Sequence, residues 1–118
     1  MLAGAGIDLA ADLYGDETDP PVLFLHGGGQ TRHAWGTAAA SVAGSGRFAI
    51  SIDLRGHGHS HWSPDGVYDF GRFGGDVRTI ASSLGRPPVL VGASLGGLSS
   101  LVAIGELGAD DEPVASAP

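Results

Sequence analysis

A serine stands between two glycines in the stretch Gly92–Gly96, which reads Gly-Ala-Ser-Leu-Gly. The apolar residues 88–91 before it predict a short buried strand, and the leucines and valine after it recur at helical spacing. A serine on a sharp turn between strand and helix can act as a nucleophile, with the N–H groups of the helix N-terminus facing a developing oxyanion. A glycine-rich turn without chemistry is the alternative. The context favours Ser94 as a candidate nucleophile.

A second glycine-rich motif, His26–Gly29, follows the apolar run Val22–Leu25. Open α/β sheets place their ligands at this end of a buried strand, and successive glycines leave backbone N–H groups accessible to an oxyanion. A phosphate-binding loop is the alternative, but a Gly-x-Gly-x-x-Gly pattern would need glycine where Arg32 stands, and a P-loop needs a lysine, which the chain lacks. The sequence therefore predicts an oxyanion site here and no cofactor.

The composition limits the possible functions. A length of 118 residues allows one small domain. The net charge of −7 argues against a nucleic-acid or anionic membrane partner, and the absence of cysteine excludes disulfides, thiol catalysis and zinc–thiolate sites. The N-terminus has no basic start and no long apolar run, so we expect neither a signal peptide nor a membrane span, and a cytoplasmic protein.

Buried strand patterns alternate with helical patterns along the chain. This order predicts a three-layer α/β fold with a mostly parallel sheet and no second domain. The expected strands are 7–13 (antiparallel, at a sheet edge), 22–25, 48–52 and 89–91, and the expected helices are about 31–42, 68–84 and 95–107. A further strand is expected to begin at 113–115.

A third motif completes a set that resembles a known family. The motifs are His26-Gly-Gly-Gly29, Asp53-Leu-Arg-Gly-His-Gly-His-Ser60 and Gly92-Ala-Ser-Leu-Gly-Gly97. In this order they resemble the α/β-hydrolase superfamily, in its epoxide-hydrolase and haloperoxidase-like branch, over residues 7–107. The resemblance implies that Ser94 is the nucleophile and that the backbone N–H groups of Gly28 and Leu95 form the oxyanion hole. We expect His26 to brace the oxyanion loop through hydrogen bonds.

Two positions depart from the pattern of the resembling proteins. Relatives often have proline where this chain has Gly29. The epoxide hydrolases and haloalkane dehalogenases of the branch that the chain resembles have an aspartate at this turn, where this chain has Ser94. Serine favours acyl transfer through a covalent acyl-enzyme, on a small-molecule ester, lactone, thioester or amide, or perhydrolysis.

The three motifs do not contain the histidine and the carboxylate that would activate Ser94. A serine nucleophile needs a histidine held by a carboxylate, and in this fold the acid and then the histidine follow the serine. No histidine follows Ser94, and Asp110, Asp111 and Glu112 read as a solvated acidic loop, with Glu106 at a helix end. We therefore expect residues 1–118 to be the N-terminal part of a single hydrolase domain, truncated after the nucleophile helix and inactive without a complementing C-terminal half. We also expect the strand 89–91 to form an exposed apolar edge.

Two other interpretations remain open from the sequence. One is a scaffold that keeps the hydrolase fold without activity. The other is a metal-binding module, because His57, His59 and His61 alternate and would share one face of an extended backbone. The resemblance instead places these histidines in a loop and implies no metal site.

Overall fold

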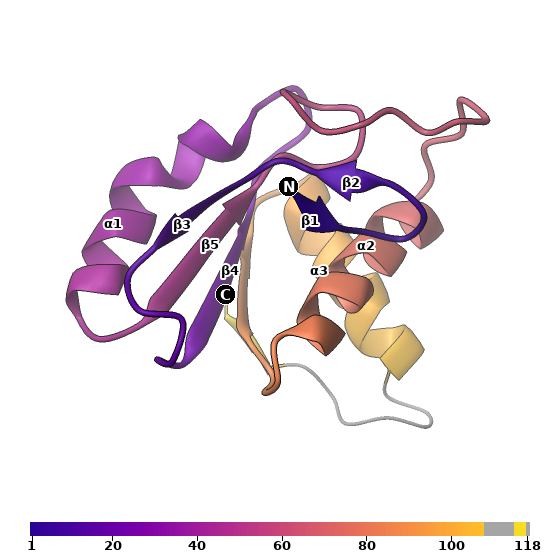
Figure 1. Ribbon diagram of the computed structural model, residues 1–118. Helices are drawn as coiled ribbons and strands as arrows, with labels where there is room; N and C mark the ends of the chain where they lie inside the picture. Colours follow the sequence, from indigo (N-terminus) through magenta and orange to yellow (C-terminus); the bar gives the residue numbers. More distant parts are fainter. Residues whose placement is uncertain (108–114, 118) are drawn as a thin grey trace.

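The computed structural model describes residues 1–107 and 115–117, and its centre is a five-stranded sheet in the order β3-β5-β4-β6-β7 (Figure 1). The strand β3 is antiparallel to β5, and the other pairs are parallel. This confirms the predicted mostly parallel sheet with an antiparallel edge. The strands are β3 (Ala11–Tyr14), β4 (Pro21–Leu25), β5 (Phe48–Ile52), β6 (Val89–Gly92) and β7 (Ala115–Ala117).

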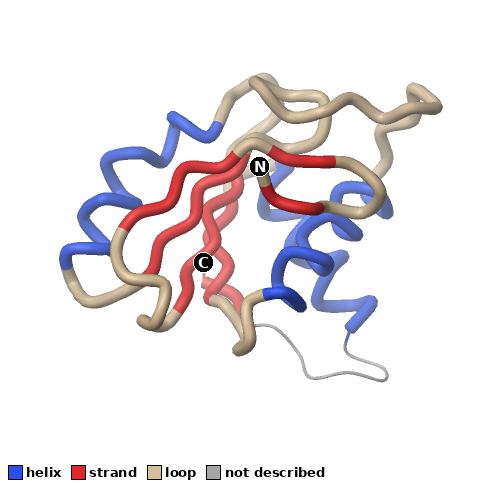
Figure 2. The backbone as a smooth tube through the Cα atoms, in the orientation of Figure 1, coloured by secondary structure: helices blue, strands red, loops and turns tan. Residues whose placement is uncertain are grey.

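Helices cover both faces of the sheet, which gives the three layers expected (Figure 2). The helix α1 (Gly36–Gly44) lies on one face, and α2 (Phe70–Ser83) and α3 (Leu95–Leu107) pack together on the other. The period of two along β4 explains the layering. Val22 and Phe24 join the core cluster that includes Ala39 of α1, whereas Leu23 and Leu25 join the larger cluster with α2 and α3. The predicted helix 31–42 consists of a 3₁₀ turn, η1 (Arg32–Trp35), followed by α1.

The strand order reverses at β4. The chain passes from β4 to β5 on one side and then returns to β6 on the other side of β4. Since parallel crossovers are right-handed, the helices after β4 and β6 lie on opposite faces, and the carboxyl ends of these two strands form the switch point at which open α/β sheets bind ligands. The loop of residues 26–30, named the oxyanion loop after its predicted role, leaves β4 there, and the Ser94 turn leaves β6 there. Topology alone therefore brings the two glycine-rich motifs together.

The expected edge strand near the N-terminus is divided. An antiparallel hairpin forms from β1 (Leu2–Ala3) and β2 (Asp8–Leu9), and β3 begins at Ala11. At Ala10 the backbone turns to the loop after β5, because its N–H donates to Ser60 Oγ (2.8 Å) and its carbonyl accepts from Asp53 N–H (2.9 Å).

The prediction that β6 is an exposed edge is wrong. Residues 89–91 of β6 pair with 115–117 of β7 as well as with β4, so β7 is the edge strand on that side. The sequence pattern did not show how far the last strand would extend or where it would pair. Asp110, Asp111, Glu112 and residues 113–114 lie outside the described residues. Among the helices that the structure describes, none is long and apolar enough to cross a membrane.

Candidate active site

The turn between β6 and α3 holds Ser94 in a conformation rare for a side chain-bearing residue. Its φ is 52°, the only positive φ of a non-glycine residue in the part of the chain described. The residue is exposed, and α3 begins at the next position. A strained backbone conformation of this kind is typical of a serine that is presented for chemistry on a strand-to-helix turn.

Two glycines make this turn possible. A Cβ on Gly92 would lie 2.6 Å from the backbone of Gly96 and Gly97, and a Cβ on Gly96 would overlap the carbonyl oxygen of Leu25. Both contacts are with backbone, which cannot move aside as a flexible side chain would. The turn therefore requires glycine at both positions, as the sequence pattern indicates.

Backbone hydrogen bonds join the Ser94 turn to the end of β4. Ala93 N–H donates to the Leu25 carbonyl (3.2 Å), and Gly96 N–H donates to the His26 carbonyl (3.1 Å). These two bonds span the serine and continue the pairing of β6 with β4 into the turn. They fix the turn against the beginning of the oxyanion loop.

The oxyanion loop is a tight turn over Gly27–Gln30. Gln30 N–H donates to the Gly27 carbonyl (3.1 Å), and the φ of Gly29 is +77°, which is the arrangement of a type II turn with glycine in its third position. Gly28 is exposed in this turn. A Cβ on Gly28 would lie 3.9 Å from Leu95 Cδ2, so the turn rests against the first residue of α3.

The structure brings together Ser94, Gly28 and Leu95, the three residues predicted from the sequence. Within residues 1–107 and 115–117, the N–H groups of Gly28 and Leu95 donate no hydrogen bond, and Ser94 Oγ has no hydrogen-bond partner. Two unpaired backbone donors beside an exposed serine are what an oxyanion hole requires.

His26 braces the loop through both of its ring nitrogens. The fully buried ring donates from Nδ1 to the Gly27 carbonyl (2.7 Å) and accepts at Nε2 from Leu54 N–H (2.9 Å). Burial lowers the pKa of His26 below its usual 6.5, which keeps the ring neutral. Since the Gly27–Gly28 peptide is planar and trans, fixing its carbonyl also fixes the direction of Gly28 N–H. This matches the bracing role expected for His26.

Asp53 organises the loop after β5, a role that the sequence motif did not predict. Its buried carboxylate accepts from the backbone N–H of Arg32 (2.6 Å) and of His59 (2.9 Å) and forms an ion pair with the Arg32 guanidinium. Burial acts to raise the pKa of Asp53, but these hydrogen bonds and the charge of Arg32 outweigh it and hold the pKa below 3.8. A Cβ on Gly58 would overlap this carboxylate, so the loop closes tightly around it.

A buried ion pair attaches the same loop to α2 and to the N-terminal hairpin. Arg55 donates from Nε and Nη2 to the two carboxylate oxygens of Asp76 (both 2.9 Å), and Nη2 also donates to the Ala5 carbonyl (2.8 Å). Asp76 in turn accepts from Ala5 N–H (2.8 Å). The sequence does not predict this ion pair, because Arg55 and Asp76 are 21 residues apart and no local pattern links them.

The extended backbone on which His57, His59 and His61 would share one face does not form. Positive φ values at Gly56 and Gly58 fold this segment into turns rather than an extended strand. His57 therefore contacts Gly29, and His59 contacts Arg32. The residues that the structure describes contain no cluster of three or more His, Asp or Glu that could hold a metal ion.

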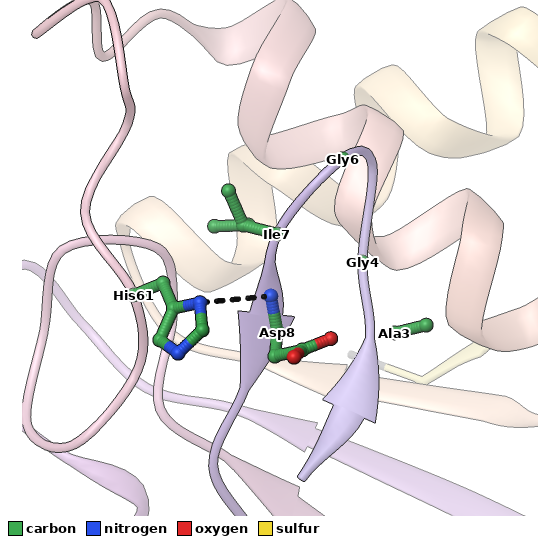
Figure 3. A pocket seen from close by; sticks show the side chains of 6 residues that line it. All are labelled: Ala3, Gly4, Gly6, Ile7, Asp8 and His61. Atoms are coloured by element: carbon green, nitrogen blue, oxygen red, sulfur yellow. Dashed lines mark hydrogen bonds between the residues drawn. The ribbon is translucent and has the colours of Figure 1, made fainter.

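Two small cavities lie away from Ser94. One, of about 270 Å³, is lined by the β1–β2 hairpin and His61, whose Nδ1 faces Asp8 N–H at 3.5 Å (Figure 3). The other, of about 320 Å³, lies at the amino ends of β4 and β5, beside Arg86. Neither cavity is lined by Ser94 or by residues 27–30.

Comparison with known proteins agrees with this geometry. A family described as the alpha/beta hydrolase fold matches residues 20–117. Esterase Rv0045c of Mycobacterium tuberculosis is 41% identical over 83 residues, which are 70% of this chain and 27% of that protein. The sn-1-specific diacylglycerol lipase ABHD11 of Mus musculus is 39% identical over 93 residues, 76% of this chain and 29% of the lipase.

Solved structures give the same result. Epoxide hydrolase VrEH1 from Vigna radiata superimposes with a TM-score of 0.79 and 25% identity, over 96% of this chain and 36% of that one. A thermophilic esterase from Thermogutta terrifontis superimposes with a TM-score of 0.71 and 31% identity, over 82% of this chain and 35% of the esterase. The chain thus spans between 27% and 36% of these four relatives. With its sheet order, its strand-to-helix serine turn and a family match over most of its length, the chain belongs to the α/β-hydrolase fold family.

Proposed function

We propose that this chain carries the nucleophile and the oxyanion hole of a serine hydrolase that acts on small-molecule esters and related acyl compounds. The observation that supports this most directly is the exposed Ser94, held at a φ of 52° beside two unpaired N–H groups. The related proteins that are esterases or a lipase favour the same class of reaction. Serine rather than aspartate at the turn favours an acyl-enzyme.

In the proposed reaction, Ser94 Oγ attacks the acyl carbon and gives its proton to a general base. The carbonyl π electrons move to oxygen, and the oxyanion accepts hydrogen bonds from Gly28 N–H and Leu95 N–H. When the carbonyl re-forms, the bond to the alcohol oxygen breaks, and the alcohol leaves with the proton from the base. Water then attacks the acyl-enzyme by the same sequence and releases the carboxylic acid and the Ser94 hydroxyl.

The base and its orienting acid are proposed to lie in polypeptide that corresponds to the remaining length of the relatives. No histidine follows Ser94 within the 118 residues, and the neutral His26 uses both ring nitrogens in the loop. We infer that residues 1–118 act as the N-terminal part of the catalytic domain and need a C-terminal complement for turnover. A chain that keeps the fold without activity is the second candidate, favoured by the same absence of histidine.

A fluorophosphonate probe tests the proposal on the full protein expressed from its own gene, together with any polypeptide that supplies the proposed base. We expect a covalent adduct on Ser94, its loss in Ser94→Ala, and unchanged labelling in Ser82→Ala, which alters an exposed serine of α2. Labelling that persists in Ser94→Ala would refute the assignment of the nucleophile. Absence of any labelling would favour the inert scaffold.

A further inference from the structure

Gly28 is held by the two peptide groups that flank it. The peptide before it is anchored through the Gly27 carbonyl, which accepts from His26 Nδ1–H. The peptide after it is anchored through Gly29 N–H, which donates to His57 Nε2 (3.2 Å). Glycine has no side chain to restrict its own dihedral angles, so Gly28 relies on external contacts. The first contact sets the direction of Gly28 N–H, and the second holds the rest of the turn that carries it.

The contacts of His57 indicate its tautomer and fix its orientation. Its Nδ1 lies 3.0 Å from the Arg55 carbonyl, which can only accept, so Nδ1 carries the hydrogen and Nε2 is free to accept from Gly29. The half-buried ring packs against His26, with 5.0 Å between ring centroids, and against Phe73 at 6.4 Å. Arg55 is itself fixed by its buried ion pair with Asp76.

We propose that His57 is a positioning residue of the oxyanion hole, which it serves by holding the Gly28–Gly29 peptide through Gly29 N–H. This inference rests on the proposed function, because it assigns His57 a role in holding the turn from which Gly28 N–H would meet the acyl oxygen. In a type II turn the orientation of this central peptide distinguishes the turn from type I, in which the peptide is flipped. The bond from Gly29 to His57 therefore selects the orientation that keeps the loop as observed.

Two substitutions separate a hydrogen-bonding role from a packing role. His57→Phe keeps an aromatic ring against His26 and Phe73 but removes the acceptor. His57→Gln loses the ring but can place Oε1 near the position of Nε2, where it accepts from Gly29 N–H. His33→Phe and His33→Gln are the controls, because His33 is exposed in η1 and its side chain faces Asp12 at 3.8 Å, away from Gly29.

The first measurement is hydrogen exchange of Gly29 N–H by NMR, which needs no enzymatic activity. We expect exchange about three to ten times faster in His57→Phe than in the unmodified protein or in His57→Gln, the range for loss of one net hydrogen bond. The second measurement is the rate of fluorophosphonate addition to Ser94, whose phosphoryl oxygen would occupy the oxyanion hole. We expect a decrease of about tenfold to a hundredfold in His57→Phe and less than about threefold in His57→Gln, since loss of a whole oxyanion donor costs 10²–10³.

Labelling of the unmodified protein tests the proposed function, whereas Gly29 exchange tests the role of His57 separately. The inference is overturned if His57→Phe keeps both the slow exchange and the labelling rate, or if His57→Gln is the more damaged variant. The second result would show that His57 acts through packing. Both control variants should match the unmodified protein.

Discussion

The turn that carries Ser94 and the loop that carries Gly28 lie at the same end of the sheet but are fixed by different interactions. Backbone hydrogen bonds to β4 hold the Ser94 turn, and glycines at 92 and 96 leave the necessary space. Side chains hold the oxyanion loop, chiefly His26 and the neighbouring imidazole of His57. The Ser94 turn depends on the absence of a Cβ at two glycines. The oxyanion loop depends on hydrogen bonds with the imidazole side chains of His26 and His57.

The largest effect is expected from crowding the Ser94 turn. In Gly96→Ala the new Cβ would overlap the Leu25 carbonyl, which belongs to a buried strand and cannot move freely. We expect a loss of about 3 kcal/mol or more in the free energy of unfolding, measured by urea denaturation.

The adjacent glycine is the matched control. A Cβ on Gly97 would lie 3.5 Å from the Gly92 carbonyl oxygen, an ordinary van der Waals distance in a helix. Gly97→Ala should therefore change stability by less than about 1 kcal/mol. Equal losses in the two variants would show that the backbone contact does not limit the turn.

A smaller effect is expected from weakening the polar core of the loop after β5. Asp53→Asn removes the charge that pairs with Arg32 and replaces one acceptor oxygen by a donor facing other donors. We expect a loss of about 2–3 kcal/mol in the free energy of unfolding. Asp12→Asn alters a more exposed partner of the same arginine, and should cost less than about 1 kcal/mol. A larger loss from Asp12→Asn would contradict the central place given to Asp53.

Mild acid should act on the oxyanion loop through His26. Because its pKa is lower in the folded chain than its ordinary 6.5, the unfolded chain binds the proton more readily. The stability linked to His26 is complete above about pH 6.5 and is lost as the pH falls from there toward the lowered folded-state pKa, by at most about 1.4 kcal/mol per pH unit. Urea unfolding at several pH values should show a slope that His26→Asn reduces and His33→Asn does not. An unchanged slope in His26→Asn would refute this account. The stability linked to Asp53 is lost only below pH 3.8.

The smallest effect concerns the backbone strain at Ser94, the proposed nucleophile. A φ of 52° is unfavourable for any residue with a Cβ, and glycine relieves it. Ser94→Gly should be about 0.5–1 kcal/mol more stable than Ser94→Ala, which keeps the Cβ, after the greater flexibility of unfolded glycine is considered. Thermal unfolding of the two variants checks this, and an Ala variant as stable as the Gly variant would show no strain.

The same difference between the two regions explains what the sequence could predict. The strand and helix periodicities and the glycines around Ser94 are local, so they predict the parallel sheet, helix 95–107 and the serine turn. The contacts of Asp53, Arg55 and His57 join residues far apart in the chain, and nothing local marks their partners. The alternation of histidines at 57–61 left a metal-binding alternative open, which the turns at two positive-φ glycines do not support. The pairing of β7 beside β6 was likewise beyond a local pattern.

The most direct test of the account is a crystal structure of the fluorophosphonate adduct. We predict phosphorus bonded to Ser94 Oγ, with the phosphoryl oxygen about 2.7–3.1 Å from both Gly28 N and Leu95 N. An adduct on another residue, or a phosphoryl oxygen directed away from these two amides, would contradict the claim that the two glycine-rich motifs form one catalytic site.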